Sequence, residues 1–339
     1  MKFSKKQILL TGCYRSGTEY ITLLLNNHPK LSSTMYIVNF MRNCYGRYDP
    51  INEERNYSKL VFETAERIRS RFKIKLNAHN VLDQCNETDH VTYGFLYDII
   101  MYELVLKDTQ KDCWAEKTQL VWTKIPDFLE QLPEGKVIHI VRNPLNVLAS
   151  FKKYTYAPEP AYLGAIFNCY DSMKKGVEYQ KNLDPSRYIL LRYEDIIADP
   201  EKTLVKVFRF LDLSHDHNLL SEEGWRDSWG RPWTQNSMFA SDNNQNNFDK
   251  SASLDRWKKN LLPWEIALCE AVNGDFLDIY GYPRPNSIID WKQMLKPCLK
   301  DTKIREHFLK WLYHQEGIEE FPTDPLLEKN WEENNIKTK

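Results

Sequence analysis

The chain has 339 residues, which is enough for one large domain or two ordinary ones. Its 46 Lys and Arg residues nearly balance its 47 Asp and Glu residues, so a general polyanion binder is excluded and no nucleic-acid partner is expected. No stretch approaches the ~18 apolar residues of a membrane span. The seven cysteines are scattered and lack CxxC spacing, a pattern typical of free thiols in a reducing compartment. From both observations we expect a cytoplasmic protein without a membrane partner.

The first predicted element is a short buried strand, Ile8 to Leu10, which leads into a turn bracketed by Gly12 and Gly17. A helical pattern follows. Backbone amides at such a helix start lack intrahelical partners, and the helix dipole adds partial positive charge, so the arrangement favours phosphate binding. The glycines have the spacing of a nucleotide P-loop, but Thr18 stands where that motif needs its lysine. We therefore predict a phosphate cradle unlike that of an ATPase, with Arg15 as its charge, and keep an ordinary strand-turn-helix as the alternative.

Two helices are predicted in the next part of the chain, separated by polar segments. Residues 58–72 and 91–106 carry apolar side chains at helical spacing, and Ser58 is placed to cap the first helix. Residues 31–57 have no sustained period and are rich in Tyr, Asn and Arg, as surface binding segments often are. Residues 79–89 are polar and are predicted to form a loop.

Short apolar runs alternate with helical patterns in the remainder of the chain. The predicted strands lie at residues 113–118, 137–141 and 188–191, and the predicted helices at 161–182, 199–211, 263–280 and 302–313. Strands that alternate with helices imply an α/β fold with a mainly parallel central sheet covered by helices on both faces. In such sheets, ligands bind beyond the carboxyl ends of the strands.

Three cations follow predicted strands. Arg15, Lys117 and Arg142 each come at a strand exit, so all three are expected to converge on one crevice. An isolated Lys or Arg is usually a solvated surface charge, but three cations at strand exits make that interpretation less attractive. The convergence predicts an anionic, nucleotide-like ligand.

The C-terminal half contains a polar stretch but no clear linker between domains. Residues 214–249 include three tryptophans and an Asn-rich run, and are predicted to form a lid over an acceptor or a simple connector. We expect one domain at residues 1–284, with inserted acceptor-binding helices and loops. Residues 285–339 are expected to form a C-terminal helical extension.

Together these segments resemble the sulfotransferases that use 3′-phosphoadenosine 5′-phosphosulfate (PAPS), in particular soluble bacterial-type members. The resemblance covers roughly residues 7–282. Residues 12–18 look like the family's 5′-phosphosulfate loop, and residues 137–150 look like its 3′-phosphate motif. Residues 191–200 match the segment that brings a tyrosine towards the nucleotide. Residues 114–118 are similar to a Glu-Lys-Thr block of bacterial members.

The resemblance implies a P-loop-like fold that binds PAPS, releases 3′-phosphoadenosine 5′-phosphate (PAP) and needs no metal. The implied donor-binding residues are Tyr14, Arg15, Ser16, Gly17, Thr18, Glu19, Tyr20, Arg142, Ser150, Tyr193, Lys250, Ser251, Ser253 and Arg256. Residues 14–19 would hold the 5′-phosphosulfate, Arg142 and Ser150 the 3′-phosphate, and Tyr20 the adenine. Cytosolic members carry Arg-Lys-Gly where this chain has Lys250-Ser251-Ala252, so Ser251 or Ser253 is the alternative to Lys250.

The implied reaction is an in-line transfer of a sulfuryl group to a hydroxyl or amine of a small-molecule or carbohydrate acceptor, such as a secondary metabolite. Arg15 and Lys117 are the candidates for stabilising charge on the leaving phosphate. Cytosolic members place a histidine base where this chain has Gln119, and protein-tyrosine sulfotransferases place a glutamate near Met35. The remaining candidate bases are Glu116, His79 and His90, each of which also suits a structural role. An amine or guanidine acceptor needs little base assistance.

Two other functional classes stay open. A kinase on a similar sheet should carry Gly-Lys-Ser/Thr in the loop, and residues 17–19 fail that requirement. A nucleotide-binding module without catalysis is compatible with the absence of the family's usual bases. Aromatic-rich segments at 36–57 and 225–233 suit a small metabolite or a sugar ring as acceptor.

Overall fold

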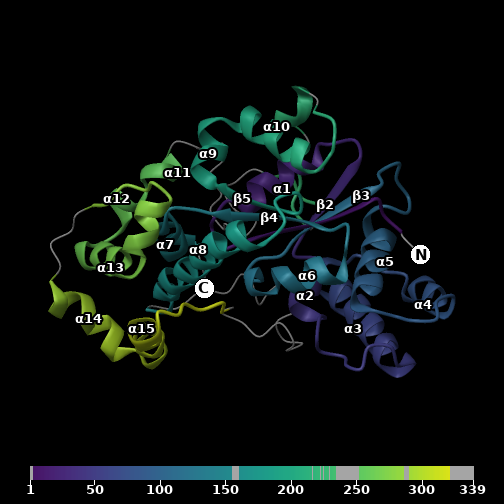
Figure 1. Cartoon of the computed structure of the whole chain (residues 1–339), viewed down its shortest axis with the longest axis horizontal. Helices are drawn as coiled ribbons and strands as arrows, with labels where there is room; N and C mark the ends of the chain where they lie inside the picture. The colour runs from purple at the N-terminus through teal and green to yellow at the C-terminus, as the bar shows by residue number, and fades with distance from the viewer. Residues whose placement is uncertain are drawn as a thin grey trace.

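The computed structural model describes residues 3–154, 160–215, 217–221, 223, 225–228, 230–233, 252–285 and 290–320. Its centre is a five-stranded sheet in the order β2-β3-β1-β4-β5, with every neighbouring pair parallel. The strands are β1 (Lys6–Gly12), β2 (Leu31–Met35), β3 (Cys113–Lys117), β4 (Lys136–Val141) and β5 (Tyr188–Arg192). Helices cover both faces, which confirms the predicted P-loop-like α/β fold (Figure 1).

The described helices vary from one turn to nineteen residues. They are α1 (Thr18–Asn26), α2 (Phe40–Asn43), α3 (Glu54–Phe72), α4 (Ala78–Asn86), α5 (Tyr93–Val105), α6 (Ile125–Gln131), α7 (Pro144–Tyr154), α8 (Gly164–Asn182), α9 (Tyr193–Ala198), α10 (Pro200–Phe210), α11 (Ala252–Asp255), α12 (Trp257–Asn260), α13 (Pro263–Ile279), α14 (Trp291–Lys300) and α15 (Thr302–His314). None of them is long and apolar enough to cross a membrane.

The sheet separates two hydrophobic cores. Ile8 and Leu10 on β1 pack in one core with residues of α1, α9 and α10. Leu9, between them, belongs to the other core, with residues of α3, α5, α6, α7 and α8. Burial on both faces explains why the strands read as apolar runs without polar alternation. In Figure 1, α1, α9 and α10 lie on one side of the sheet, and α5 and α6 lie on the other.

The edge strand β2 is a regular element where we expected irregular chain. Its sequence, Leu-Ser-Ser-Thr-Met, is polar, and Ser32 and Ser33 are half-buried. The strand forms because it pairs with β3, with Leu31 opposite Cys113. This pairing is a long-range interaction, so the local sequence carries no strand signal.

Two further predictions, a loop at residues 79–89 and a helix cap at Ser58, were also wrong. Residues 79–89 do not form a loop, because α4 occupies most of them and buries Val81 and Cys85 on one side. Asn77 starts this helix by accepting a hydrogen bond from the backbone N–H of Asn80 at 3.3 Å. Ser58 does not cap α3, because the helix begins at Glu54 and runs through that position. Asp199 caps α10 by accepting a bond from the Lys202 amide at 2.9 Å.

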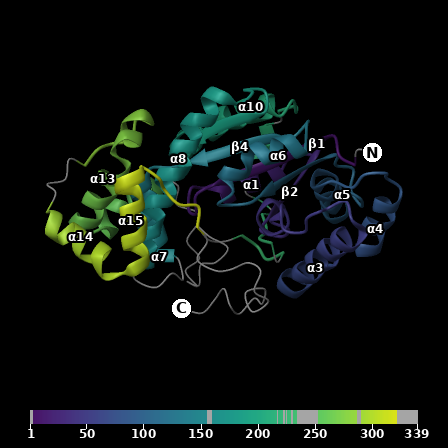
Figure 2. The ribbon, with the colours of Figure 1, turned by 60° about the horizontal axis from the view of Figure 1, so that its bottom comes forward.

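The described part of the C-terminal extension packs on the rest of the chain. Lys174 on α8 donates to the carbonyl of Gln315 at 2.7 Å, and the backbone N–H of Thr123 donates to Glu319 at 2.8 Å. Figures 1 and 2 both show α13, α14 and α15 grouped on the side of the molecule away from α3 and α4. The domain boundary at residue 284 stays a prediction. Most of the predicted lid at 214–249 lies outside the described residues.

Candidate active site

The loop between β1 and α1 has the backbone shape of an anion cradle. Arg15 and Gly17 have positive φ angles of 64° and 88°. Left-handed residues in such a loop turn backbone N–H groups towards one concavity, which attracts anions. The hydroxyl of Ser16 donates to the carbonyl of Cys13 at 2.6 Å and holds the loop closed. Arg15 extends from this loop, and its Nε donates to Ser150 on α7 at 3.0 Å.

Gly17 is required by its contact with Tyr193. A Cβ added at this position would lie 2.1 Å from Cδ2 of the tyrosine ring. We predict that Gly17→Ala lowers the free energy of unfolding by about 1–3 kcal/mol, because either the ring or the loop must move, and that it weakens binding of PAP, the ligand expected from the sequence, more than about tenfold. Gly46→Ala is the matched control, since Gly46 also has a positive φ, of 70°, but its added Cβ would have nothing within 4 Å.

Thermal unfolding and PAP titration of both glycine variants test this prediction. Equal PAP affinities for Gly17→Ala and Gly46→Ala would show that the contact between the loop and the Tyr193 ring is not needed for binding.

Arg142 joins the loop to the β4–β5 side of the site. Its guanidinium donates to the carbonyl of Arg15 at 2.8 Å and to the carbonyl of Ser253 at 2.5 Å, and lies 4.2 Å from the centre of the Tyr193 ring. The Tyr193 hydroxyl is 3.1 Å from Oγ of Ser253. Burial lowers the pKa of Arg142. Its Nε is buried and has no hydrogen-bond partner in the described part of the chain.

Lys117 lies on the β3 side of β1, opposite to the side that carries Arg142. It is the last residue of β3 and stands beside Leu10 in the parallel register. The side chain is fully buried, and its Nζ lies 3.6 Å from Oε1 of Glu19 and 3.3 Å from the centre of the Tyr36 ring. Burial lowers the pKa of Lys117 to about 7, although Glu19 opposes that shift. Among the described residues, Nζ has no hydrogen-bond partner.

A hydrogen-bonded cluster surrounds this lysine. The Tyr36 hydroxyl donates to Oε1 of Glu19 at 2.5 Å and lies 3.0 Å from Oε1 of Gln119. The side-chain amide of Gln119 donates to the hydroxyl of Thr18 at 3.1 Å. Burial and the nearby Glu19 raise the pKa of Tyr36 well above its usual range, so its phenol stays protonated. Sequence reasoning missed Tyr36 because it missed β2, the strand that this residue follows.

The contacts of Glu116, a candidate base, indicate a structural role. Its carboxylate accepts bonds from the backbone N–H groups of Asn39 at 2.7 Å and Phe40 at 3.0 Å, and from the hydroxyl of Tyr97 at 2.5 Å. These contacts hold the first turn of α2. Burial raises the pKa of Glu116. The carboxylate is fully buried and committed to these donors, so we no longer propose it as the base.

The two candidate histidines are not brought to the loop. His79 and His90 are exposed, the first on α4 and the second after that helix. In Figures 1 and 2, α4 lies towards the side where β1 begins, whereas the glycine loop follows the other end of β1. Neither histidine is retained as a candidate base.

The other predicted donor-binding residues occupy varied positions around the loop. The ring of Tyr20 is buried and packs edge-on against Trp225, with 5.8 Å between ring centres. The ring of Tyr14 lies 6.0 Å from that of Phe151. Arg256 is half-buried at the start of α12. Lys250 and Ser251 lie outside the described residues.

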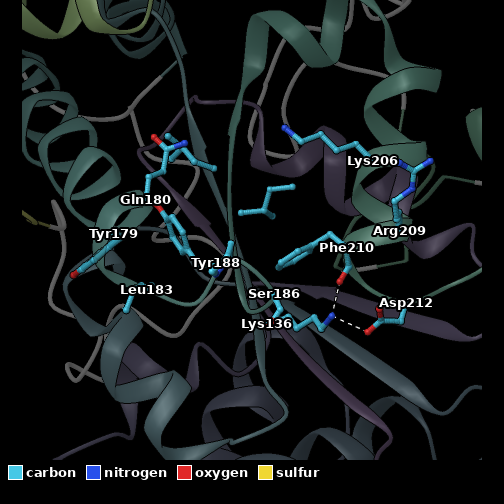
Figure 3. Close-up of a pocket in the computed structure, with 13 residues that line it drawn as sticks. Lys136, Tyr179, Gln180, Leu183, Ser186, Tyr188, Lys206, Arg209, Phe210 and Asp212 are labelled. Atoms are coloured by element: carbon cyan, nitrogen blue, oxygen red, sulfur yellow. Dashed lines mark hydrogen bonds and ion pairs between the residues drawn. The ribbon is translucent and has the colours of Figure 1, made fainter.

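A hollow of about 510 Å³ lies beside β5, away from these residues. Figure 3 shows it between α8, which contributes Tyr179 and Gln180, and α10, which contributes Lys206. Lys136 on its wall already donates to the carbonyl of Phe210 at 2.5 Å and to Asp212 at 2.8 Å. None of the predicted donor-binding residues lines this hollow.

Comparison with known proteins gives one family. The model described as "Sulfotransferase family" matches residues 7–217. Two curated proteins, the omega-hydroxy-beta-dihydromenaquinone-9 sulfotransferases Stf3 of Mycobacterium bovis and Mycobacterium tuberculosis, are each 35% identical over 101 residues. These matches cover 26% of this chain, and the chain spans only 26% of the length of each relative.

Two solved structures share the fold. The sulfotransferase domain of the Synechococcus PCC 7002 olefin synthase is 19% identical, with a TM-score of 0.55, over 84% of this chain and 98% of that one. The sulfotransferase domain of the curacin biosynthetic pathway is 17% identical, with a TM-score of 0.51, over 82% of this chain and 98% of that one. At these identities, the similarity shows a common fold.

Proposed function

The chain belongs to the sulfotransferase family, and on that premise we propose that it transfers a sulfuryl group from PAPS to a hydroxyl or amine of a small-molecule or carbohydrate acceptor. One observation supports this most: Lys117 Nζ and Arg142 Nε are buried and lack hydrogen-bond partners among the described residues. They lie on opposite sides of β1, which carries the loop. Buried charged donors that lack a hydrogen-bond acceptor are costly, so these two nitrogen atoms fit a ligand with two anionic groups.

The proposed donor lies across the carboxyl ends of three strands. The amides of residues 14–19, with Arg15 and Lys117, would hold the 5′-phosphosulfate. Arg142, Ser150 and Ser253, on the side of β4 and β5, would hold the 3′-phosphate. Tyr193 has its ring against both the loop and Arg142, and would place the nucleoside. Each assignment uses contacts that the protein already makes around the loop.

The chemistry proposed for this site is charge stabilisation during in-line transfer. As the bond between sulfur and the 5′-phosphate oxygen breaks, negative charge grows on that phosphate. Arg15 and Lys117 are fixed next to the loop, and fixed charges in a dry site stabilise such a state without reorganisation. We propose a small acceptor rather than a macromolecule.

Calorimetric titration with PAP and with ATP tests the nucleotide assignment. We expect PAP to bind at least tenfold more tightly than ATP, and a preference for ATP would contradict the proposal. Transfer of labelled sulfate from PAPS to a panel of sugars, phenols, amines and a long-chain terminal alcohol then tests catalysis. The alcohol is included because the curated relatives are named for an omega-hydroxy substrate. PAP binding without any transfer or PAPS hydrolysis would favour a non-catalytic nucleotide-binding module.

The pKa of about 7 at Lys117 predicts that PAP affinity depends on pH. A bound phosphate favours the protonated amine, but the free protein loses that proton as pH rises above 7. Affinity should therefore fall by up to about tenfold per pH unit above pH 7. PAP titrations between pH 6 and pH 9 measure this slope, and Lys117→Met should flatten it. An affinity that is constant or rises above pH 7 in the unaltered protein would contradict the prediction.

A further inference from the structure

We propose that Glu19 is the proton acceptor of the transfer reaction and that Tyr36 positions it. The inference rests on the proposed sulfuryl transfer, and it supplies the base that sequence reasoning did not find. It changes the role of Glu19, whose position in the loop suggested a donor ligand. The geometry that leads to it is the cluster of Glu19, Tyr36, Gln119 and Lys117 on the β2–β3 side of the loop.

The order of the strands fixes where the acceptor must approach. The residues proposed to hold the 3′-phosphate and nucleoside follow β4 and β5, on one side of β1. In-line transfer requires the nucleophile to approach sulfur from the side opposite the leaving phosphate. The acceptor therefore enters over β3 and β2. Tyr36 and Gln119 follow these two strands, and both contact residues of the first turn of α1, Glu19 and Thr18 respectively.

The carboxylate of Glu19 is unsuited to phosphate binding. A negative side chain repels a phosphosulfate, so within the cradle only the backbone N–H of Glu19 suits the donor. The same carboxylate suits proton abstraction because it keeps 10% exposure next to the loop. Its two described polar contacts, to Tyr36 and Lys117, are both made by Oε1.

Other buried carboxylates near the site are committed elsewhere. Glu116 accepts hydrogen bonds from two backbone amides and a tyrosine at the start of α2. Glu265 on α13 is fully buried and pairs with Lys152 of α7 at 2.9 Å. Glu194 accepts from the backbone N–H of Asn143 at 3.0 Å, on the β4–β5 side that the donor occupies. Among these described residues, Glu19 is the carboxylate on the acceptor side that no backbone amide engages.

The acceptor oxygen forms a bond to sulfur, and the bond between sulfur and the 5′-phosphate oxygen breaks, with its electron pair leaving on PAP. The acceptor's hydroxyl proton moves to the Glu19 carboxylate and passes to solvent after product release. The Tyr36 phenol donates to Glu19 and fixes its orientation, while protonated Lys117 stabilises the leaving phosphate.

The test compares reactions that need a proton acceptor with one that does not. Release of labelled sulfate from PAPS to water needs a base and requires no knowledge of the natural acceptor. The reverse reaction, sulfuryl transfer from p-nitrophenyl sulfate to PAP, releases p-nitrophenolate and needs no proton. For Glu19→Gln we expect PAPS hydrolysis to fall about 10²–10⁴-fold, with the reverse reaction and PAP affinity within about threefold of the unaltered protein.

Two further variants complete the design. Tyr36→Phe should slow PAPS hydrolysis about tenfold and leave the reverse reaction unchanged, because it loosens the base without removing it. Glu66→Gln is the control, since Glu66 is an exposed residue paired with Arg69 on α3 and should leave both reactions unaltered.

The outcomes separate this inference from the proposed function. If Glu19→Gln hydrolyses PAPS at the unaltered rate, the base assignment is wrong, and the neutral amine of Lys117 becomes the remaining candidate. If both reactions and PAP affinity fall together, Glu19 acts in donor binding or structure, which also overturns the inference. If the unaltered protein does not bind PAP, the proposed function itself fails.

Discussion

Lys117→Met is expected to leave a folded protein that still binds PAP but transfers sulfate about 10²–10³-fold more slowly. The amine is fully buried and carries no hydrogen bond to any described residue, and its contacts are the Tyr36 ring and the Glu19 carboxylate. Methionine has a similar length and an apolar tip that suits the buried position beside the Tyr36 ring. What the substitution removes is the cation next to the breaking bond, where charge develops during transfer.

Initial rates of labelled-sulfate transfer, together with thermal unfolding, measure the effect of Lys117→Met. The free energy of unfolding should fall, because the substitution leaves the buried Glu19 carboxylate without the amine that lies 3.6 Å from it. Lys206→Met is the matched control, since Lys206 is exposed on α10 and lines the hollow beside β5. A Lys117→Met protein that is stable and fully active would show that Lys117 takes no part in transfer.

Arg142→Ala is expected to weaken PAP binding about 100-fold and to leave the affinity for AMP within about threefold. One charge-assisted hydrogen bond from the buried Nε to a phosphate contributes about 1.5–3 kcal/mol, up to about 100-fold in affinity, and the 3′-phosphate would lose it. AMP lacks that phosphate, so its affinity reports damage to the loop alone. This comparison is needed because Arg142 also donates to the carbonyl of Arg15.

Arg142→Lys separates charge from geometry in the same assay. Lysine keeps the positive charge but cannot reproduce the planar guanidinium fork that contacts Arg15 and Ser253. We expect its PAP affinity to lie between those of the unaltered protein and Arg142→Ala. Unchanged PAP affinity in Arg142→Ala would remove Arg142 from the 3′-phosphate site.

The parts of the site that could be predicted from the sequence are those that depend on patterns of neighbouring residues. A buried apolar run, two glycines and a helical pattern identify β1, the loop and α1 without reference to the rest of the chain. Lys117 and Arg142 were placed by the rule that parallel strands share a carboxyl edge, and the structure puts them on either side of the loop. The role of each residue in binding and transfer stays a proposal.

The features that could not be predicted from the sequence depend on contacts between segments that are distant in the chain. β2 has a polar sequence and exists because it pairs with β3, so Tyr36 was not seen as a residue at a strand exit. Glu19 was assigned by its position in the loop, and only its contacts with Tyr36 and Lys117 suggest another role. Glu116 was a candidate base until its commitment to the start of α2 was visible.

The central claim is that cations from separate strands gather round one doubly phosphorylated nucleotide. A crystal structure of the protein with PAP bound tests it most directly. We expect the 5′-phosphate on the amides of residues 14–19 within hydrogen-bond distance of Lys117 Nζ, and the 3′-phosphate bonded by Arg142 and Ser150. PAP bound elsewhere, or bound in the loop with Lys117 and Arg142 both out of contact with its phosphates, would contradict the account.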